Sequence, residues 1–171
     1  MPGEPPLIVT ALLDQGAFDW FDDLRRTHYP QARNRVPAHL TLFHGLPGDQ
    51  ESAVAEILTA ACRGRGPIRL EARGPWFLGQ GVAYRIGSTD LEALRRQLAT
   101  AFDPWLTAQD RAPFRPHVTV QNKVEPEEAR RLLERLQLEF EPFEVWAEGL
   151  LVWRYLRRRW ESVAQLPFDA R

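Results

Sequence analysis

Two short segments of the sequence carry the same arrangement of residues able to do chemistry. His39-Leu40-Thr41-Leu42 and His117-Val118-Thr119-Val120 both alternate a polar residue with an apolar one. This alternation predicts strands in which histidine and threonine share one face while the apolar residues face the core. The chain has four histidines in all, so two copies of one pattern indicate a functional pair rather than a coincidence.

A pair of imidazoles that face each other suits general acid–base catalysis. A neutral histidine takes a proton from the nucleophile, and a protonated one gives a proton to the leaving oxygen. We therefore predict His39 and His117 as the catalytic residues. Thr41 and Thr119 can donate hydrogen bonds to a phosphate as negative charge builds on it. Arg115, which precedes the second motif, is a further candidate for phosphate binding.

Other enzyme classes lack their signatures in this chain. Zinc or iron would need a third ligand at a suitable spacing from the two histidines, and neither an HExxH nor a CxxC motif is present. The nucleophile elbow GxSxG, the P-loop and GxGxxG are also missing from the sequence. We therefore predict a site that needs neither a metal nor a cofactor.

Length and composition indicate an ordinary globular protein. The 171 residues are 44% hydrophobic and 26% charged, which is typical of one domain, and we expect residues 1–171 to form it. A net charge of −1 disfavours a general binder of nucleic acid duplexes, but a small or terminal phosphate remains a suitable ligand. One cysteine, Cys62, excludes an intramolecular disulfide and is predicted to be buried. With no signal segment and no membrane-spanning run, we expect a cytoplasmic monomer.

Apolar patterning predicts similar sets of elements in the two halves of the chain, each containing one motif strand. We therefore predict an α+β fold of two lobes with a pseudo-twofold relation and a cleft where the polar strand faces meet. The predicted strands cover residues 7–13, 39–46, 68–78, 81–86, 115–123, 140–155 and 160–166, and the predicted helices cover residues 17–28, 50–63, 91–106 and 127–136.

Strict alternation also places other polar residues near the motifs. His44 lies five residues after His39 and is predicted on the opposite face, whereas Gln121 is predicted on the face of His117. His28 ends a predicted helix, where a cation suits the helix dipole, and we interpret it as structural. The turn Arg157-Arg158-Arg159 is interpreted as a solvated hairpin tip or as a patch for an anionic ligand.

The two motifs resemble those of the two-histidine (2H) phosphoesterases, a superfamily that includes bacterial 2′-5′ RNA ligase-like proteins and 2′,3′-cyclic phosphodiesterases. Both segments match the His-x-Thr/Ser-x pattern of that family, and the order of elements is similar over nearly the whole chain. The resemblance implies two lobes of antiparallel sheet with outer helices and a metal-independent site between them. It implies that His39 and His117 act as acid and base and that Thr41 and Thr119 hold the phosphate.

The resemblance implies an enzyme that opens 2′,3′-cyclic phosphates of nucleotides or RNA ends, or one that joins RNA ends through a 2′-5′ bond. The nearly identical motifs leave open which histidine is the acid. A module that binds RNA ends without turnover and a structural domain with coincidental motifs are the alternatives. Aromatic residues that could stack on a base, or pack in the core instead, are Phe43, Trp76, Tyr84 and Trp153.

Overall fold

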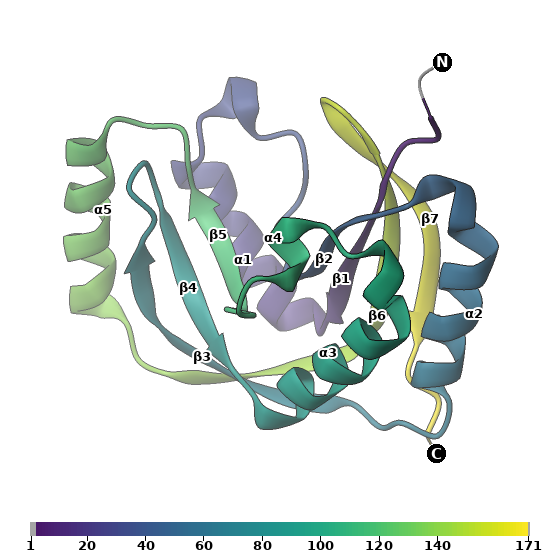
Figure 1. Ribbon diagram of the computed structural model, residues 1–171. Helices are drawn as coiled ribbons and strands as arrows, with labels where there is room; N and C mark the ends of the chain where they lie inside the picture. The colour runs from purple at the N-terminus through teal and green to yellow at the C-terminus, as the bar shows by residue number, and fades with distance from the viewer. Residues whose placement is uncertain (1–2, 171) are drawn as a thin grey trace.

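The protein is seen here in a computed structural model that describes residues 3–170 and contains an antiparallel sheet with helices around it. The strands pair in the order β2-β1-β6-β3-β4-β5, and β7 pairs with β6 off this path (Figure 1). The strands are β1 (Leu7–Leu13), β2 (Thr41–Leu46), β3 (Ile68–Phe77), β4 (Val82–Gly87), β5 (His117–Gln121), β6 (Phe143–Leu156) and β7 (Arg159–Pro167).

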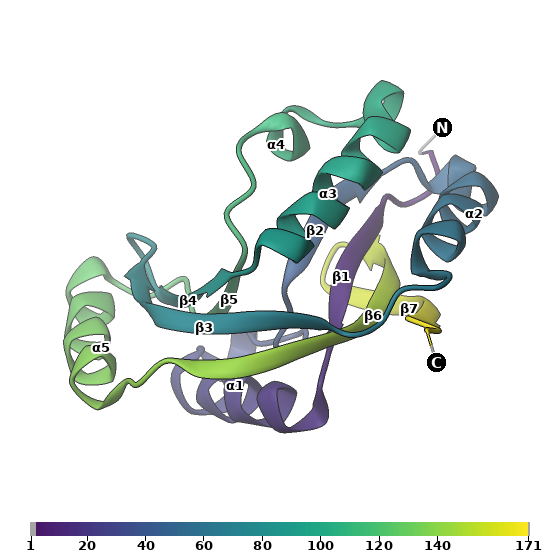
Figure 2. The same ribbon diagram turned by 90° about the horizontal axis from the view of Figure 1, so that it is seen from below.

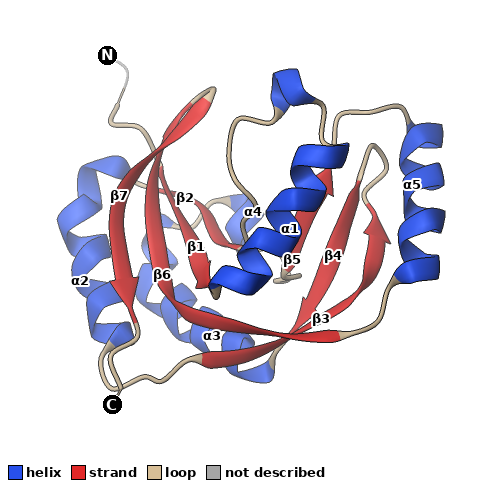
Figure 3. Cartoon of the chain, turned by 180° about the vertical axis from the view of Figure 1, so that it is seen from behind, coloured by secondary structure: helices blue, strands red, loops and turns tan. Residues whose placement is uncertain are grey.

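Helices cover the outside of the sheet, as the predicted α+β fold requires. The helices are α1 (Gln15–His28), α2 (Glu51–Cys62), α3 (Thr89–Phe102), α4 (Ala108–Arg111) and α5 (Pro126–Glu139), and the short 3₁₀ turns are η1 (Gln31–Arg33), η2 (Gly48–Gln50) and η3 (Asp103–Trp105). In Figure 3, α5 lies at the end of the molecule formed by β3 and β4, and α2 lies at the opposite end, beside β7. Helix α1 packs against β5. The predicted fold class is confirmed.

Strand β6 joins the two lobes because its two ends have different neighbours. Its first residues, 143–147, pair with β3, whereas residues 147–154 pair with β1 and residues 149–156 pair with β7. One lobe therefore contains β2, β1, β7 and the second part of β6, and the other contains β3, β4, β5 and the first part. Figure 2 shows β6 running beside β3 and then on to β7.

The two motif strands, which lie at opposite ends of the strand order, meet at one point. Leu40 and Val118 form an isolated antiparallel bridge between them, and both side chains are completely buried. The carbonyl of Leu40 also accepts a hydrogen bond from Ala11 N at 2.9 Å, which anchors this end of the first motif to β1. The bridge brings the two lobes together at the motifs themselves.

Both motif strands contain a β-bulge at the last residue of the motif. In β2, Thr41 lies opposite Thr10 of β1 but Phe43 lies opposite Val9, so β2 has one extra residue between them. The bulge turns two successive side chains, Leu42 and Phe43, to the buried side. The side chain of the next residue, His44, therefore points to the same face as His39 and Thr41.

The bulge in β5 has the same form. Thr119 lies opposite Ala83 of β4 and Gln121 lies opposite Val82, which again leaves one extra residue in the motif strand. Val120 and Gln121 are both buried as a result, at 0% and 3% exposure. The matching bulges extend the pseudo-twofold relation of the lobes beyond the motifs.

These bulges correct two sequence predictions. His44 does not point to the opposite face from His39, because the extra residue in β2 shifts the alternation by one and returns it to the same face. Gln121 does not share the exposed face of His117, because the bulge in β5 buries it. Both errors come from assuming strict alternation through the strand.

Other differences from the predicted elements lie mainly at their ends and in one loop. The predicted loop over residues 107–113 contains α4, whose Thr107 accepts a hydrogen bond from Asp110 N at 3.2 Å. Helix α3 ends at Phe102, before Pro104, and β5 ends at Gln121. Cys62 is buried, as predicted. Within residues 3–170, no helix has the length and apolar character needed to cross a membrane.

Gly81 allows β5 to approach the β3–β4 hairpin closely, because a Cβ atom there would overlap the backbone carbonyl of Gln121. We therefore expect Gly81→Ala to lower the free energy of unfolding by about 2 kcal/mol, by forcing apart backbones that cannot yield as a side chain can. Urea denaturation measures the change. Gly74→Ala is the matched control, because its Cβ would meet open space, and it should stay within about 0.5 kcal/mol of the native chain. Equal losses in the two variants would contradict the close approach.

Candidate active site

The bridge between Leu40 and Val118 determines how the four polar motif residues face one another. Residues opposite each other in an antiparallel pair project to the same side, so His39 is placed opposite Thr119 and Thr41 opposite His117. These four side chains line one pocket of about 210 Å³, together with Ile8, His44 and Trp160. The structure thus brings together both predicted catalytic residues and both threonines.

Both motif histidines are held in the same way by the backbone that precedes them. His39 Nδ1 lies 2.8 Å from the carbonyl oxygen of Pro37, and His117 Nδ1 lies 2.7 Å from that of Arg115. A carbonyl oxygen can only accept, so Nδ1 carries the proton in each ring and donates it. This arrangement leaves Nε2 of each ring available to a substrate, as base when neutral and as acid when protonated.

The surroundings of His39 favour its neutral form. Burial of the imidazole lowers the pKa of His39 to about 4, although the hydrogen bond to the carbonyl of Pro37 opposes this change. The positive charges of Arg25, His117 and His44 lower the pKa further. At neutral pH, His39 is therefore unprotonated and can accept a proton.

Each motif histidine also contacts a tryptophan. The ring of Trp160 lies 4.5 Å from that of His39, between centroids, and Trp76 lies 5.4 Å from His117 at 90° to it. Trp153 packs on Trp160 at 5.9 Å, so it supports the pocket wall. Of the aromatic candidates, Trp76 alone contacts a motif histidine, and Trp160 was not predicted from the sequence. Its position beside the arginine-rich turn was the available signal.

Phe43 and Tyr84 belong to the core rather than to the site. Their side chains are 0% and 1% exposed. Phe43 packs edge-on against Phe102, at 5.2 Å between centroids, and Tyr84 contacts Phe140 at 5.4 Å. Neither ring is accessible for stacking on a base.

Two buried arginines, absent from the sequence prediction, hold each motif strand from a helix in the other half of the chain. Arg25 of α1 donates to the carbonyl oxygen of Thr119 at 3.0 Å, and Arg95 of α3 donates to that of Leu42 at 2.7 Å. Burial lowers the pKa of both guanidinium groups, a cost that charged hydrogen bonds to fixed carbonyls offset. Each half of the chain thus supplies a cation that fixes the backbone of the other half's motif strand.

A third histidine, His44, lines the pocket as a consequence of the β2 bulge. Its Nδ1 lies 3.0 Å from Oδ1 of Asp110, a residue of α4 that is 2% exposed. The sequence prediction assigned His44 to the other face and did not single out the role of Asp110. A bulge leaves no clear signature in the sequence, so this pair could be found only in the structure.

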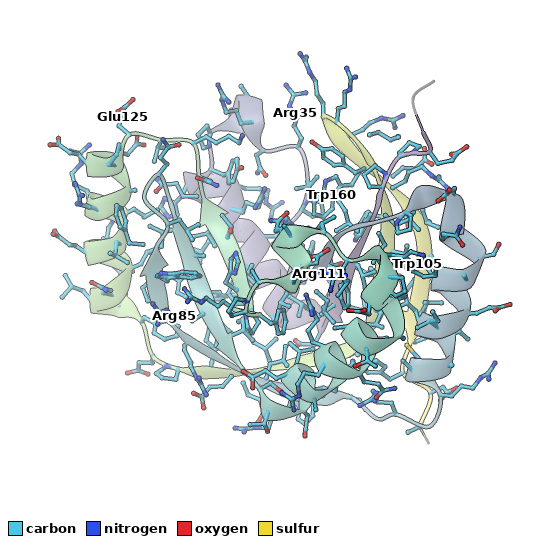
Figure 4. The ribbon with its side chains drawn as sticks, in the orientation of Figure 1. Arg35, Arg85, Trp105, Arg111, Glu125 and Trp160 are labelled. Carbon is cyan, nitrogen blue, oxygen red and sulfur yellow. The ribbon has the colours of Figure 1, made fainter. Side chains whose placement is uncertain are left out.

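A basic groove adjoins the pocket on the side of His39. It has a volume of about 560 Å³, and Trp160 lines both the groove and the pocket. Figure 4 places Trp160 and Arg35 on the same side of the molecule, beside the tip of the β6–β7 hairpin. Within residues 3–170, the groove lining includes five arginines, one lysine and no carboxylate. The lining residues are Arg25, Tyr29, Ala32, Arg33, Arg35, Val36, Lys123, Arg157, Arg158 and Trp160.

The structure does not bring the side chain of Arg115 into the motif pocket. Its side chain lines a neighbouring pocket of about 400 Å³ with Trp76 and Arg85, and its backbone carbonyl holds His117. Its role in phosphate binding stays a prediction. In the part of the chain that the structure describes, no group of three or more His, Cys, Asp or Glu side chains is arranged to hold a metal ion.

Comparison with known proteins agrees with this geometry. The model of the 2′-5′ RNA ligase superfamily matches residues 13–159. No curated protein matches the sequence. The crystal structure of TT0787 from Thermus thermophilus is similar, with a TM-score of 0.70 and 16% identity over 95% of this chain and 97% of that chain.

Structures of LigT from E. coli are also similar. LigT complexed with 3′-AMP has a TM-score of 0.62 and 17% identity over 97% of this chain and 99% of that chain. LigT complexed with NADP+ has a TM-score of 0.61 and 17% identity over 98% and 99% of the two chains. At such low identities, these matches establish a shared fold.

We expect His39 to titrate well below the ordinary histidine value of 6.5, with a pKa of about 4. Below pH 6.5 the unfolded chain binds a proton at His39, whereas the folded chain binds it only near pH 4 and below. The contribution of neutral His39 to the free energy of unfolding is therefore complete above pH 6.5. It is lost as the pH falls toward 4, by at most about 3 kcal/mol. Two-dimensional NMR of the ring protons measures the pKa directly, and urea denaturation of His39→Asn against the native chain isolates the stability difference. An NMR titration midpoint near 6.5 would contradict the buried, cation-flanked environment.

Proposed function

The chain belongs to the 2′-5′ RNA ligase superfamily, and from this premise we propose that it is a metal-independent phosphoesterase that opens 2′,3′-cyclic phosphates of nucleotides or RNA ends. The observation that carries the proposal is the register at the Leu40–Val118 bridge. This register places two imidazoles and two hydroxyls around one pocket. The LigT complexes with 3′-AMP and with phosphate support a phosphate ligand for this fold.

The proposed reaction is an in-line displacement at phosphorus. Thr41 and Thr119 donate to the two non-bridging oxygens of the cyclic phosphate. Neutral His39 takes a proton from a water as its oxygen attacks phosphorus, and protonated His117 gives a proton to the ribose oxygen that leaves. One P–O bond forms and one breaks, so the products are a phosphomonoester and a free ribose hydroxyl. His39 then carries the proton and His117 has lost one, and exchange with solvent restores both.

The two sides of the pocket suggest where the parts of the substrate lie. The leaving ribose oxygen must be beside the acid, His117, and Trp76 stands next to that ring, where it can pack against a base or sugar. The attacking oxygen lies on the side of His39, where the basic groove opens. The lowered pKa of His39 supports its assignment as the base.

A second candidate function, the joining of RNA ends, is favoured by the basic groove. In that reaction a 5′-hydroxyl of a second RNA strand takes the place of the water beside His39 and forms a 2′-5′ bond. Such a strand needs a surface that binds its phosphates next to His39, and six cationic side chains line the groove there. The same groove would also hold the remote phosphates of an oligonucleotide during hydrolysis.

Hydrolysis of the four nucleoside 2′,3′-cyclic monophosphates in EDTA tests the main proposal. We expect turnover in the native chain and a fall in kcat of about 10²- to 10⁴-fold in His39→Ala and in His117→Ala, because each removes one proton transfer. Thr41→Val and Thr119→Val should lose about 10²-fold through loss of a donor to the phosphate. Rates measured by chromatography of the products give all five values.

His28→Ala is the matched control, because His28 lies at the end of α1 and does not line the pocket. Its rate should equal that of the native chain. Activity that EDTA abolishes would refute metal independence. Absence of turnover on both mononucleotides and RNA ends, with tight binding of a cyclic-phosphate end, would instead support a binding module without catalysis.

The groove predicts a preference for longer substrates. We expect Arg157→Gln combined with Arg158→Gln to raise KM for an oligonucleotide ending in a 2′,3′-cyclic phosphate by about tenfold, through lost phosphate contacts. The KM for a cyclic mononucleotide should stay unchanged. Arg131→Gln combined with Arg135→Gln on α5, outside the groove lining, controls for the same loss of two positive charges. Equal effects on both substrates would contradict a role for the groove in binding the chain.

A further inference from the structure

His44 gives the pocket a third imidazole that belongs to neither motif. It lines the same pocket as His39 and His117, and its positive charge contributes to lowering the pKa of His39. Its side chain is 42% exposed, so a ligand in the pocket can reach it. The acid–base reaction proposed above uses two histidines and leaves His44 without a function.

Asp110 holds the His44 ring in one orientation. The carboxylate accepts from His44 N at 2.9 and 3.0 Å, from Gly45 N at 3.2 Å and from His44 Nδ1 at 3.0 Å. Burial opposes ionisation, but these hydrogen bonds hold the pKa of Asp110 below its usual range. The carboxylate is therefore ionised, so Nδ1 donates to it and Nε2 is left for a ligand.

The ring of His44 is not required to build the bulge. Asp110 already satisfies the backbone N–H groups of His44 and Gly45, whatever side chain stands at position 44. In the other lobe, the residue that follows the matching bulge is Asn122, and its side chain accepts from the adjacent Lys123 N at 2.8 Å. The pocket thus has a third imidazole on one side only, whereas the histidines and threonines of the motifs occur in pairs.

We propose that His44, oriented by Asp110, is a third phosphate-binding residue of the pocket and favours phosphate groups that carry two negative charges. This inference rests on the proposed function only in that the pocket accepts a phosphate. With Nδ1 bonded to a carboxylate and Nε2 to a phosphate oxygen, the ring is the cation between two anions, an arrangement that strengthens both hydrogen bonds. A phosphomonoester, the product of cyclic phosphate opening, carries the higher charge and gains more than the cyclic diester.

The charged groups around His44 agree with this role. Asp110 accepts from Nδ1 of the ring, and Arg95 donates to the backbone carbonyl of Asp110 at 2.8 Å, so Arg95 helps to fix α4. Across the pocket stand His39 and His117, which bring no negative charge. Among the described residues, those that line the pocket include no carboxylate, so an anion bound between the three imidazoles meets no negative charge there.

Binding of inorganic phosphate and of 3′-AMP, followed by NMR of the histidine rings, tests the proposal without need of turnover. In the native chain, both ligands should shift the His44 ring signals and protonate Nε2. In His44→Gln, the Kd for each should rise about 10- to 100-fold, the range expected for loss of a charged hydrogen bond. Kd for a 2′,3′-cyclic monophosphate should rise less. His28→Gln is the matched control and should bind as the native chain does.

The outcome is separable from that of the proposed function. If phosphate shifts the His44 signals in a chain that turns over no cyclic phosphate, the phosphate-binding role stands and the proposed reaction fails. If phosphate shifts His39 and His117 but leaves His44 and the Kd of His44→Gln unchanged, the role of His44 is refuted. Added imidazole should restore phosphate affinity to His44→Gly, whereas a purely structural role predicts no such rescue. The ring signals of the native chain decide the question even if a variant fails to fold.

Discussion

The antiparallel bridge between Leu40 and Val118 is the contact on which the arrangement of the candidate site depends. It links strands at opposite ends of the sheet order, and both its side chains are buried in the shared core. Because side chains alternate along a strand, burial of these two residues forces the flanking histidines and threonines onto the other face. A shift of the bridge by one residue would turn every one of them into the core.

Two buried arginines donate hydrogen bonds to backbone carbonyls of the motif strands, one on each strand, close to this bridge. Arg25 and Arg95 reach from a helix in one half of the chain to a motif-strand carbonyl of the other half, so neither motif is fixed by its own half alone. A guanidinium is costly to bury unless each donor finds an acceptor, so these contacts tolerate little displacement. The rigidity that the proposed phosphate site needs thus comes from polar contacts between the two halves of the chain as well as from the apolar core.

The pseudo-twofold symmetry of the site is incomplete, because the surroundings of His39 differ from those of His117. Burial and neighbouring cations favour the neutral form of His39, the basic groove opens beside it, and Trp76 stands beside His117. His44 adds an imidazole at a position where the second lobe has Asn122. In the proposed reaction, the duplicated motifs supply the reacting groups, and the unpaired features distinguish the attacking side from the leaving side.

Local patterning in the sequence was sufficient to predict the two motif strands and the α+β fold, because alternation involves residues close in the chain. The tertiary structure alone revealed the bulges, the two arginines that link the halves of the chain and the His44–Asp110 pair. Those features depend on strand register and on contacts between distant segments, and alternation read without the bulge assigned His44 to the wrong face. A sequence specifies which residues can react, but register and packing determine which of them meet.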